Sequence, residues 1–223
     1  MLLFMRSAQY PIPTFITFVI IAVIGFAYHE FAHAIVADRL GDPTPRSFGR
    51  ITLNPIPHLD RTGLILLLIV GFGFASTPVN PRNLRGNMRV SHAIVAIAGP
   101  LTNLLLAALF GLPVLLGLVT EQPPGPVLPS AYSFLAFGVF FNLLLFTFNM
   151  LPVPPLDGFT ILLGVLPAEM ASQLRPLQQY GFMIFMLIFF VLPLVNIDVF
   201  SLFFIPVWRF FSPILLAGSP IYL

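Results

Sequence analysis

The strongest constraint in this sequence is its series of long apolar runs. They cover residues 12–37, 63–75, 90–119, 131–151, 180–197 and 199–217. Only 8% of the 223 residues are charged, against about 25% in an average soluble domain, so a soluble fold of this size lacks the charges to cover its surface. A helix that crosses a bilayer needs about 20 apolar residues. The sequence therefore predicts an all-α, polytopic membrane helical bundle with five to six spans, folded as a single domain over residues 1–223.

Charge and cysteine content exclude two further possibilities. The formal net charge is only +2, which is too small to favour a nucleic-acid partner. The chain has no cysteine, so disulfides and thiolate metal sites are excluded. A metal site in this chain must therefore use other ligands.

The run 63–75 differs from the other apolar runs. It has 13 residues, three of them glycine, and is too short for an ordinary span, so we expect a short re-entrant segment. Seven arginines flank it: Arg39, Arg46, Arg50 and Arg61 before it, and Arg82, Arg85 and Arg89 after it. A re-entrant segment places both groups on one side of the membrane, which the positive-inside rule makes the cytoplasmic side. We therefore expect a multi-pass protein of the cell membrane with its N-terminus outside.

Residues 49–54 have a pattern of their own. They alternate apolar and polar side chains and stop at Pro55, which predicts a small β-strand after the first span, on the cytoplasmic side. An unpaired strand edge there can accept another extended chain. An ordinary loop explains the same residues equally well.

The residues that carry chemistry are concentrated in His29-Glu30-Phe31-Ala32-His33, within the first span. Two His residues at i and i+4 lie one turn apart on one face of a helix, so their imidazole nitrogens can hold one Zn²⁺. Glu30 lies on an adjoining face, where its carboxylate can take a proton from a zinc-activated water and pass it to a leaving amine. Ionisable groups inside an apolar helix indicate function by default. The alternative is a structural role, with both His packed against polar neighbours and Glu30 neutral.

A catalytic zinc site needs a third protein ligand and an open fourth position. Asp157 is the candidate, because three prolines break the fourth run just before it and Gly158 permits a turn that aims its carboxylate inward. Asp38, Asp42 and Asp60 compete for this role. They lie among arginines at the aqueous edge, where solvation or an ion pair explains them better. Asp157 can alternatively serve as a helix N-cap.

Taken together, these motifs resemble the site-2 protease family of intramembrane zinc metalloproteases, in its short prokaryotic branch without PDZ or CBS domains. The resemblance covers about residues 15–165 and rests on the His29–His33 motif, the stretches 49–60 and 78–85, the stretch Ala98–Asn103, and the stretch from Asn149 to Gly158. It implies a zinc held by His29, His33 and Asp157, with Glu30 as the general base. It also implies cleavage of peptide bonds in or near a transmembrane segment, in substrates that are often single-span proteins.

Asn103 and Asn149 are uncharged hydrogen-bonding groups inside apolar runs. One interpretation is that one or both contact the substrate backbone or stabilise an oxyanion. The other is hydrogen bonding between helices, the usual use of Asn in membranes. The sequence leaves open the roles of His58, Asp60, His92 and Arg209.

The sequence thus predicts a zinc endopeptidase whose partners are a membrane-protein substrate and the lipid bilayer. From His33 to Asp38 is about 8 Å along the helix, which places the site toward the cytoplasmic end of the first span. Two alternatives are a membrane metal transporter with the same three ligands and a proteolytically inactive relative that binds membrane proteins. Transport predicts further ligands along a path through the membrane, whereas the sequence shows one compact cluster.

Overall fold

A computed structural model describes residues 10–58 and 76–218 of the chain, and this part is helical. The α-helices are α2 (Pro11–Arg39), α3 (Thr44–Ser47), α5 (Met88–Leu115), α6 (Ala131–Met150), α7 (Asp157–Val165), α8 (Ala168–Leu174), α9 (Gly181–Met186) and α10 (Val199–Leu215). Short 3₁₀ helices η1 (Ile56–His58) and η2 (Pro81–Asn83) lie in loops, and η3 (Arg175–Tyr180) joins α8 to α9. Helix α9 continues through the π-helical η4 (Leu187–Val191) and through η5 (Leu192–Val195).

Four helical stretches are long and apolar enough to cross a membrane: Pro11–Arg39, Met88–Leu115, Ala131–Met150 and Ala168–Val195. The prediction of five to six spans is therefore too high for the described residues. The last apolar run forms α10, which has only 17 residues. Asp198 caps its start by accepting a hydrogen bond from the Ser201 N–H, and the positive φ of Ala217 and Gly218 follows its end. The expected re-entrant segment 63–75 lies outside the described residues.

Local sequence explains where the long helices begin and end. Pro11 starts α2, at a position whose N–H would have no partner in the helix. Helix α5 follows Asn87, whose side chain accepts a hydrogen bond from the Arg89 N–H. Gly41, with φ of +105°, follows the end of α2, and Gly117, with φ of +67°, follows the end of α5. Glycine adopts this left-handed conformation readily, so both positions stop a helix.

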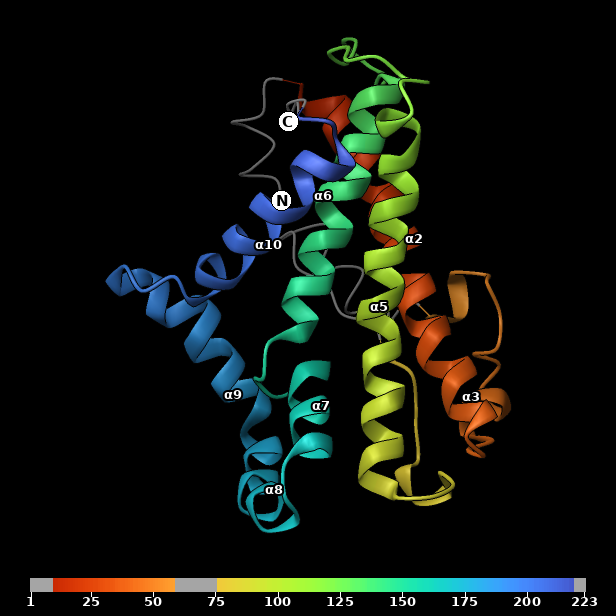
Figure 1. Cartoon of the computed structure of the whole chain (residues 1–223), viewed down its shortest axis with the longest axis vertical. Helices are drawn as coiled ribbons and strands as arrows, with labels where there is room; N and C mark the ends of the chain where they lie inside the picture. The colour runs from red at the N-terminus through yellow and green to blue at the C-terminus, as the bar shows by residue number, and fades with distance from the viewer. Residues whose placement is uncertain (1–9, 59–75, 219–223) are drawn as a thin grey trace.

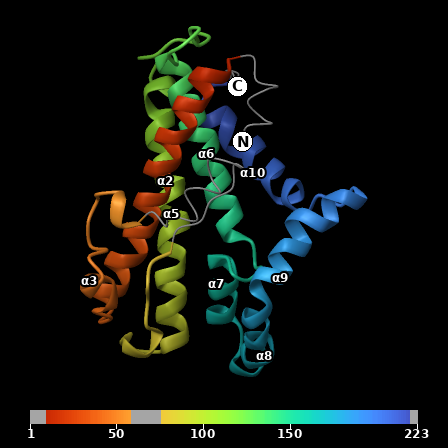
Figure 2. The same ribbon diagram turned by 180° about the vertical axis from the view of Figure 1, so that it is seen from behind.

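Helix α5 packs against α2, α6 and α7 at the centre of the bundle (Figure 1). Helix α7 continues in the direction of α6 after a break, so the two together run along α5 (Figure 1). Helices α9 and α10 form an arm that splays away from the bundle, and α10 returns to pack against α6 (Figure 2). The break between α6 and α7 therefore lies inside the bundle.

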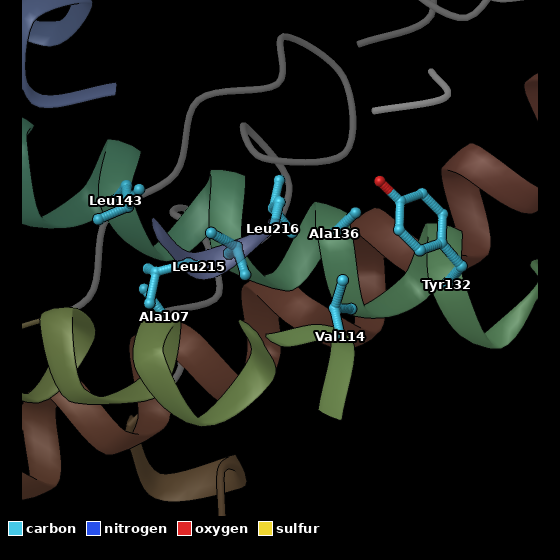
Figure 3. Packing of buried hydrophobic residues seen from close by; sticks show 8 residues of the cluster. Ala107, Val114, Tyr132, Ala136, Leu143, Leu215 and Leu216 are labelled. Atoms are coloured by element: carbon cyan, nitrogen blue, oxygen red, sulfur yellow. The ribbon is translucent and has the colours of Figure 1, made fainter. Parts of the chain in front are cut away.

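A core of small and apolar side chains joins α5, α6 and α10 (Figure 3). It comprises Ala107 and Val114 of α5, Tyr132, Ala136 and Leu143 of α6, and Leu215 and Leu216 at the end of α10. The outer surface of α5 is equally apolar: Leu101, Leu105, Leu109 and Leu112 are 45–59% exposed at helical spacing. Lipid is the solvent that such a stripe requires.

The predicted β-strand at residues 49–54 is wrong, since the structure assigns no strand in the ranges that it describes. The polar groups of this segment bond within it. Gly49 adopts φ of +67°, Thr52 Oγ1 accepts a hydrogen bond from the Asn54 N–H, and the Thr52 carbonyl lies 2.7 Å from His58 Nε2. Local hydrogen bonds of this kind compete with a strand ladder. The expected strand edge for an extended chain is lost with the strand.

Asp42 ties the loop after α2 to the segment before α5. Its side chain is fully buried. It accepts hydrogen bonds from Thr44 Oγ1 at 2.6 Å, the Asn80 N–H at 2.7 Å and Asn83 Nδ2 at 2.9 Å. The sequence favoured solvation or an ion pair for Asp42, and it is buried instead because residues 80–83 fold against it.

We expect Asp42→Asn to lower stability more than Asp38→Asn. Burial raises the pKa of Asp42. The hydrogen bonds that its carboxylate accepts lower the pKa by more than burial raises it, so the pKa lies below its usual value. Stability from such a group is present above the unfolded-state pKa, about 4, and is lost as pH falls through the folded-state pKa. An amide in its place loses charged hydrogen bonds, at a cost of about 2 kcal/mol.

Asp38 is the matched control, because it pairs with an Arg46 side chain that is 65% exposed, and exposed ion pairs stabilise little. Thermal unfolding in detergent between pH 3 and 8 measures both variants. Asp42→Asn should unfold at a lower temperature at pH 7, and the difference from wild type should shrink in acid. Equal unfolding temperatures for the two variants at pH 7 would contradict the role of Asp42.

Candidate metal centre

Two helices bring three ligand-type side chains to one point. His29 and His33 come from α2, and Asp157 comes from the start of α7. The two His Nε2 atoms are 2.9 Å apart, and Asp157 Oδ2 lies 3.1 Å from the first and 3.2 Å from the second. Both His residues are buried. Within the described ranges, this is the one cluster of His, Asp and Glu with a metal-type arrangement.

The other ring nitrogen of each His is already engaged. His29 Nδ1 lies 2.6 Å from Asn103 Oδ1, and His33 Nδ1 lies 2.8 Å from the carbonyl oxygen of Val95. Both partners are acceptors, so each neutral imidazole carries its proton on Nδ1. The unprotonated Nε2 atoms then face each other and the carboxylate of Asp157.

Three electron-pair donors at these distances repel one another unless a cation neutralises them. Asp157 Oδ2 is buried and has no hydrogen-bond donor among the described residues. Tetrahedral Zn²⁺ with bonds near 2.0–2.2 Å separates its ligand atoms by about 3.3 Å, close to the separations seen here. The donor set of two imidazoles and one carboxylate therefore fits zinc, with a fourth position left for water or substrate.

Gly99 lets α5 approach this cluster. A Cβ atom at residue 99 would lie 2.5 Å from His33 Nε2 and 2.6 Å from His29 Nε2. A methyl group there would occupy space next to the ligand atoms. The absence of a side chain at Gly99 therefore keeps this side of the cluster open.

We expect Gly99→Ala to lose most of its zinc, because the new methyl group collides with both Nε2 atoms and forces the rings apart. Gly125→Ala is the matched control, since the atom nearest to a Cβ at residue 125 is Leu128 O, at 3.5 Å. Zinc content per chain, measured by plasma mass spectrometry on detergent-purified protein, compares the two. A full complement of zinc in Gly99→Ala would show that the rings do not meet at the metal.

The interruption of the helix between α6 and α7 directs Asp157 toward the interior of the bundle. Leu156 occupies the N-cap position, and no side chain caps the helix, so the N-cap alternative for Asp157 does not apply. A Cβ atom on Gly158 would overlap the carbonyl oxygens of Met150 and Leu151. Gly158 therefore allows the first turn of α7 to pack directly against the end of α6, and Asp157 then points toward α2.

Glu30 is buried beside the two His residues. Its Oε2 accepts a 2.6 Å hydrogen bond from Thr77 Oγ1, while Oε1 has no hydrogen-bond partner in the described part of the chain. Thr77 escaped the sequence analysis because it is 47 residues away and belongs to no motif that signals a partner for Glu30. The contact with Thr77 therefore fixes the position of one carboxylate oxygen.

Asn103 lies behind His29 and is fully buried. Its Oδ1 faces the imidazole, and its Nδ2 donates to Gly25 O at 3.2 Å and to Asn142 Oδ1 at 3.1 Å. Both ends of the amide are therefore used between helices α2, α5 and α6. Asn142 is a further polar residue of this network that the sequence analysis missed.

The other residues considered from the sequence have different surroundings. Asn149 donates to Leu145 O at 3.0 Å, one turn earlier in α6, and is partly exposed. Asp38 forms the ion pair with Arg46. His58 is fully buried in the loop after α3, Arg209 is exposed on α10, and Asp60 lies outside the described residues.

Comparison with known proteins adds an independent line of evidence. A family model described as peptidase family M50 matches residues 119–194. A Bacillus subtilis protein named "Putative zinc metalloprotease YwhC" is 40% identical over 191 residues, which are 85% of this chain and 86% of the relative. Rip2 of Mycolicibacterium smegmatis, described in the same words, is 34% identical over 179 residues, 78% of this chain and 66% of the relative. No solved structure matches the chain at a significant level.

Proposed function

Since the chain belongs to peptidase family M50, the site-2 protease family of zinc metalloproteases, we propose that it cleaves peptide bonds in or near the transmembrane segments of membrane proteins. The family and the zinc cofactor agree with the prediction from sequence. The observation that carries the proposal is a zinc-type ligand cluster beside a buried carboxylate on a helix long enough to cross a membrane. A single-span protein is the substrate that we expect.

We assign His29, His33 and Asp157 as the zinc ligands. Zinc bound there supplies a Lewis acid that acidifies water and polarises a carbonyl group. Glu30 takes the proton of the attacking water and passes it to the leaving amine. Thr77 holds Glu30 Oε2 in place, so the carboxylate is oriented before substrate arrives.

The imidazole ligands are held by their own partners. Asn103 and the Val95 carbonyl accept from the Nδ1 atoms of His29 and His33, which keeps both Nε2 lone pairs directed at the metal position. Because both ends of its amide are bonded within the protein, we assign Asn103 to ligand orientation and not to substrate.

The substrate must present its peptide bond in an extended form, since a helical turn shields the carbonyl. Asn149 lies at the end of α6, just before the break that leads to Asp157. Its Oδ1 accepts no hydrogen bond from another described residue, so it can bond an N–H of the unwound substrate backbone. We therefore propose Asn149, and not Asn103, as the contact with substrate.

We further propose a position in the cell membrane with the site toward the cytoplasmic side. The Arg85 N–H donates to Leu40 O at 2.8 Å, and Asp42 accepts from Asn80. These contacts bring the arginine-rich stretches 39–50 and 82–89 to the same end of the bundle. The positive-inside rule favours the cytoplasm for that end.

A membrane metal transporter is the alternative function. Transport needs further ligands along a path through the membrane, and the described ranges hold one metal-type cluster. Glu30 is adjacent to His29 in the sequence, so it does not provide a second metal site farther along a transport path. Hydrolysis accounts for Glu30 and for its contact with Thr77, so we favour the peptidase.

Reconstitution in liposomes with a labelled single-span peptide tests this function. We expect cleavage that stops when a zinc chelator is added and returns when zinc is restored. A parallel assay with a zinc-sensitive dye inside the liposomes measures metal flux, which should match that of protein-free liposomes. Zinc flux through the wild-type protein, together with no cleavage of any of several different single-span peptides, would favour the transporter.

A further inference from the structure

A second feature, with both polar and apolar lining residues, lies between α5, α7 and η3. It is a cavity of about 190 Å³ whose polar lining comes from Arg89, His92, Thr160, Arg175 and Gln178. Pockets for drug-sized ligands are larger, about 300–1,000 Å³, so this volume suits a small ion or one headgroup. The three metal ligands do not line the cavity, although His92 on its wall lies close enough to His33 and Asp157 for electrostatic interaction. Anion binding there does not require the proposed peptidase function.

The arginines of this cavity have no acidic partner in direct contact among the described residues. Arg89 and Arg175 both line it. Within the ranges 10–58 and 76–218, no acidic side chain lines the cavity and neither arginine forms an ion pair. Arg89 Nη1 donates to the Leu166 carbonyl at 3.2 Å, which holds its guanidinium at the end of α7. Two guanidiniums stay charged at any physiological pH, so the cavity favours an anion over a neutral or cationic ligand.

The neutral polar groups suit the same ligand. The Thr160 hydroxyl and the Gln178 amide supply hydrogen-bond donors beside the two arginines. Helix α7 closes the cavity against α5 at Gly164, where an added Cβ would overlap that of Ala93. This close contact makes the lining a packed wall and not a loose surface.

The position in the membrane indicates which anion is available. The cavity lies between the stretches Met88–Leu115 and Ala168–Val195, both long enough to be spans, and Arg89 is the second residue of α5. Just beyond η3, Phe182 is 73% exposed and Met183 is 62% exposed, as expected for side chains in lipid. Basic pockets between membrane helices near the cytoplasmic surface bind anionic lipid headgroups.

We propose that this cavity binds a phosphate oxyanion through Arg89 and Arg175. The anion is the headgroup phosphate of an anionic phospholipid or free inorganic phosphate, since both present the same oxygens. Guanidinium groups recognise such oxygens with charge-assisted hydrogen bonds. The apolar surface next to η3 accommodates acyl chains when the source is a lipid.

Native mass spectrometry of the delipidated protein tests the proposal. Wild-type protein is titrated with phosphatidylglycerol and with zwitterionic phosphatidylcholine, and inorganic phosphate is added as a competitor. We expect phosphatidylglycerol to bind at least 10-fold more tightly than phosphatidylcholine, and Arg175→Gln and Arg89→Gln each to weaken it about 10-fold. If millimolar phosphate displaces phosphatidylglycerol, the free ion is also a ligand. If phosphate does not displace it, the ligand is the lipid.

Arg39→Gln is the matched control, because Arg39 is an exposed arginine outside the cavity, and it should bind phosphatidylglycerol as the wild type does. Unfolding temperature and zinc content report whether each variant is folded. Arg175 is exposed, so Arg175→Gln should fold even if Arg89→Gln does not. Unchanged phosphatidylglycerol binding in folded Arg175→Gln, or an equal loss in Arg39→Gln, would overturn the proposal.

Discussion

Glu30→Gln is expected to lower the rate of peptide cleavage by about 10²- to 10⁴-fold while zinc stays bound, because general-base catalysis contributes about that much. Gln has nearly the size of Glu and can still accept the hydrogen bond that Thr77 donates in the wild-type protein. It cannot take a proton from water. The variant should therefore fold, keep one zinc per chain and hold uncleaved substrate in its cleft.

Glu169→Gln is the matched control, since Glu169 is exposed on α8. This variant should cleave the peptide at the wild-type rate. Initial rates on a reconstituted single-span peptide, normalised to zinc content, compare the two variants. Co-purification of intact substrate with Glu30→Gln provides a second measurement. Cleavage by Glu30→Gln at the wild-type rate would show that Glu30 is not the base and that the assigned mechanism is wrong.

Asp157→Asn is expected to weaken zinc binding by at least about 100-fold. Mutation of a residue that only supports a metal ligand already lowers metal affinity by about 10- to 100-fold, and Asp157 is assigned as a ligand itself. The substitution keeps the shape of the side chain but removes the negative charge that faces the two imidazoles at 3.1 and 3.2 Å. Cleavage should fall with zinc content, because the chemistry that zinc supplies is lost with the ion.

Asp38→Asn provides the comparison for this variant, since Asp38 pairs with Arg46 and should keep its zinc. Competition with a chelator of known affinity measures the dissociation constant of each variant. Partial recovery of activity in Asp157→Asn at high zinc concentration would support a ligand role. Wild-type affinity in Asp157→Asn would remove the third ligand from the account.

The candidate ligands could be predicted because their signals are local in the sequence. His29 and His33 are one helical turn apart, so any helix there places both rings on one face. Asp157 follows a proline-rich break and precedes Gly158, and the break is what turns the carboxylate toward α2. The apolar composition of the chain was likewise enough to predict a bundle of membrane-spanning helices.

The features that the sequence analysis missed depend on contacts between distant segments. Thr77 reaches Glu30 across 47 residues, and Asn142 reaches Asn103 across 39, with no local pattern that pairs them. Asp42 is buried by a segment 38 residues later in the chain. The predicted strand at 49–54 failed for the opposite reason, because local hydrogen bonds satisfied a backbone whose alternation had suggested pairing.

Zinc held between α2 and α7 is tested most directly by the metal content of the double variant His29→Ala/His33→Ala. Wild-type protein purified without added chelator should contain one zinc per chain by plasma mass spectrometry. The double variant loses two of the three converging ligand atoms and should contain none, while circular dichroism shows the same helix content. Stoichiometric zinc in the folded double variant would contradict the assignment.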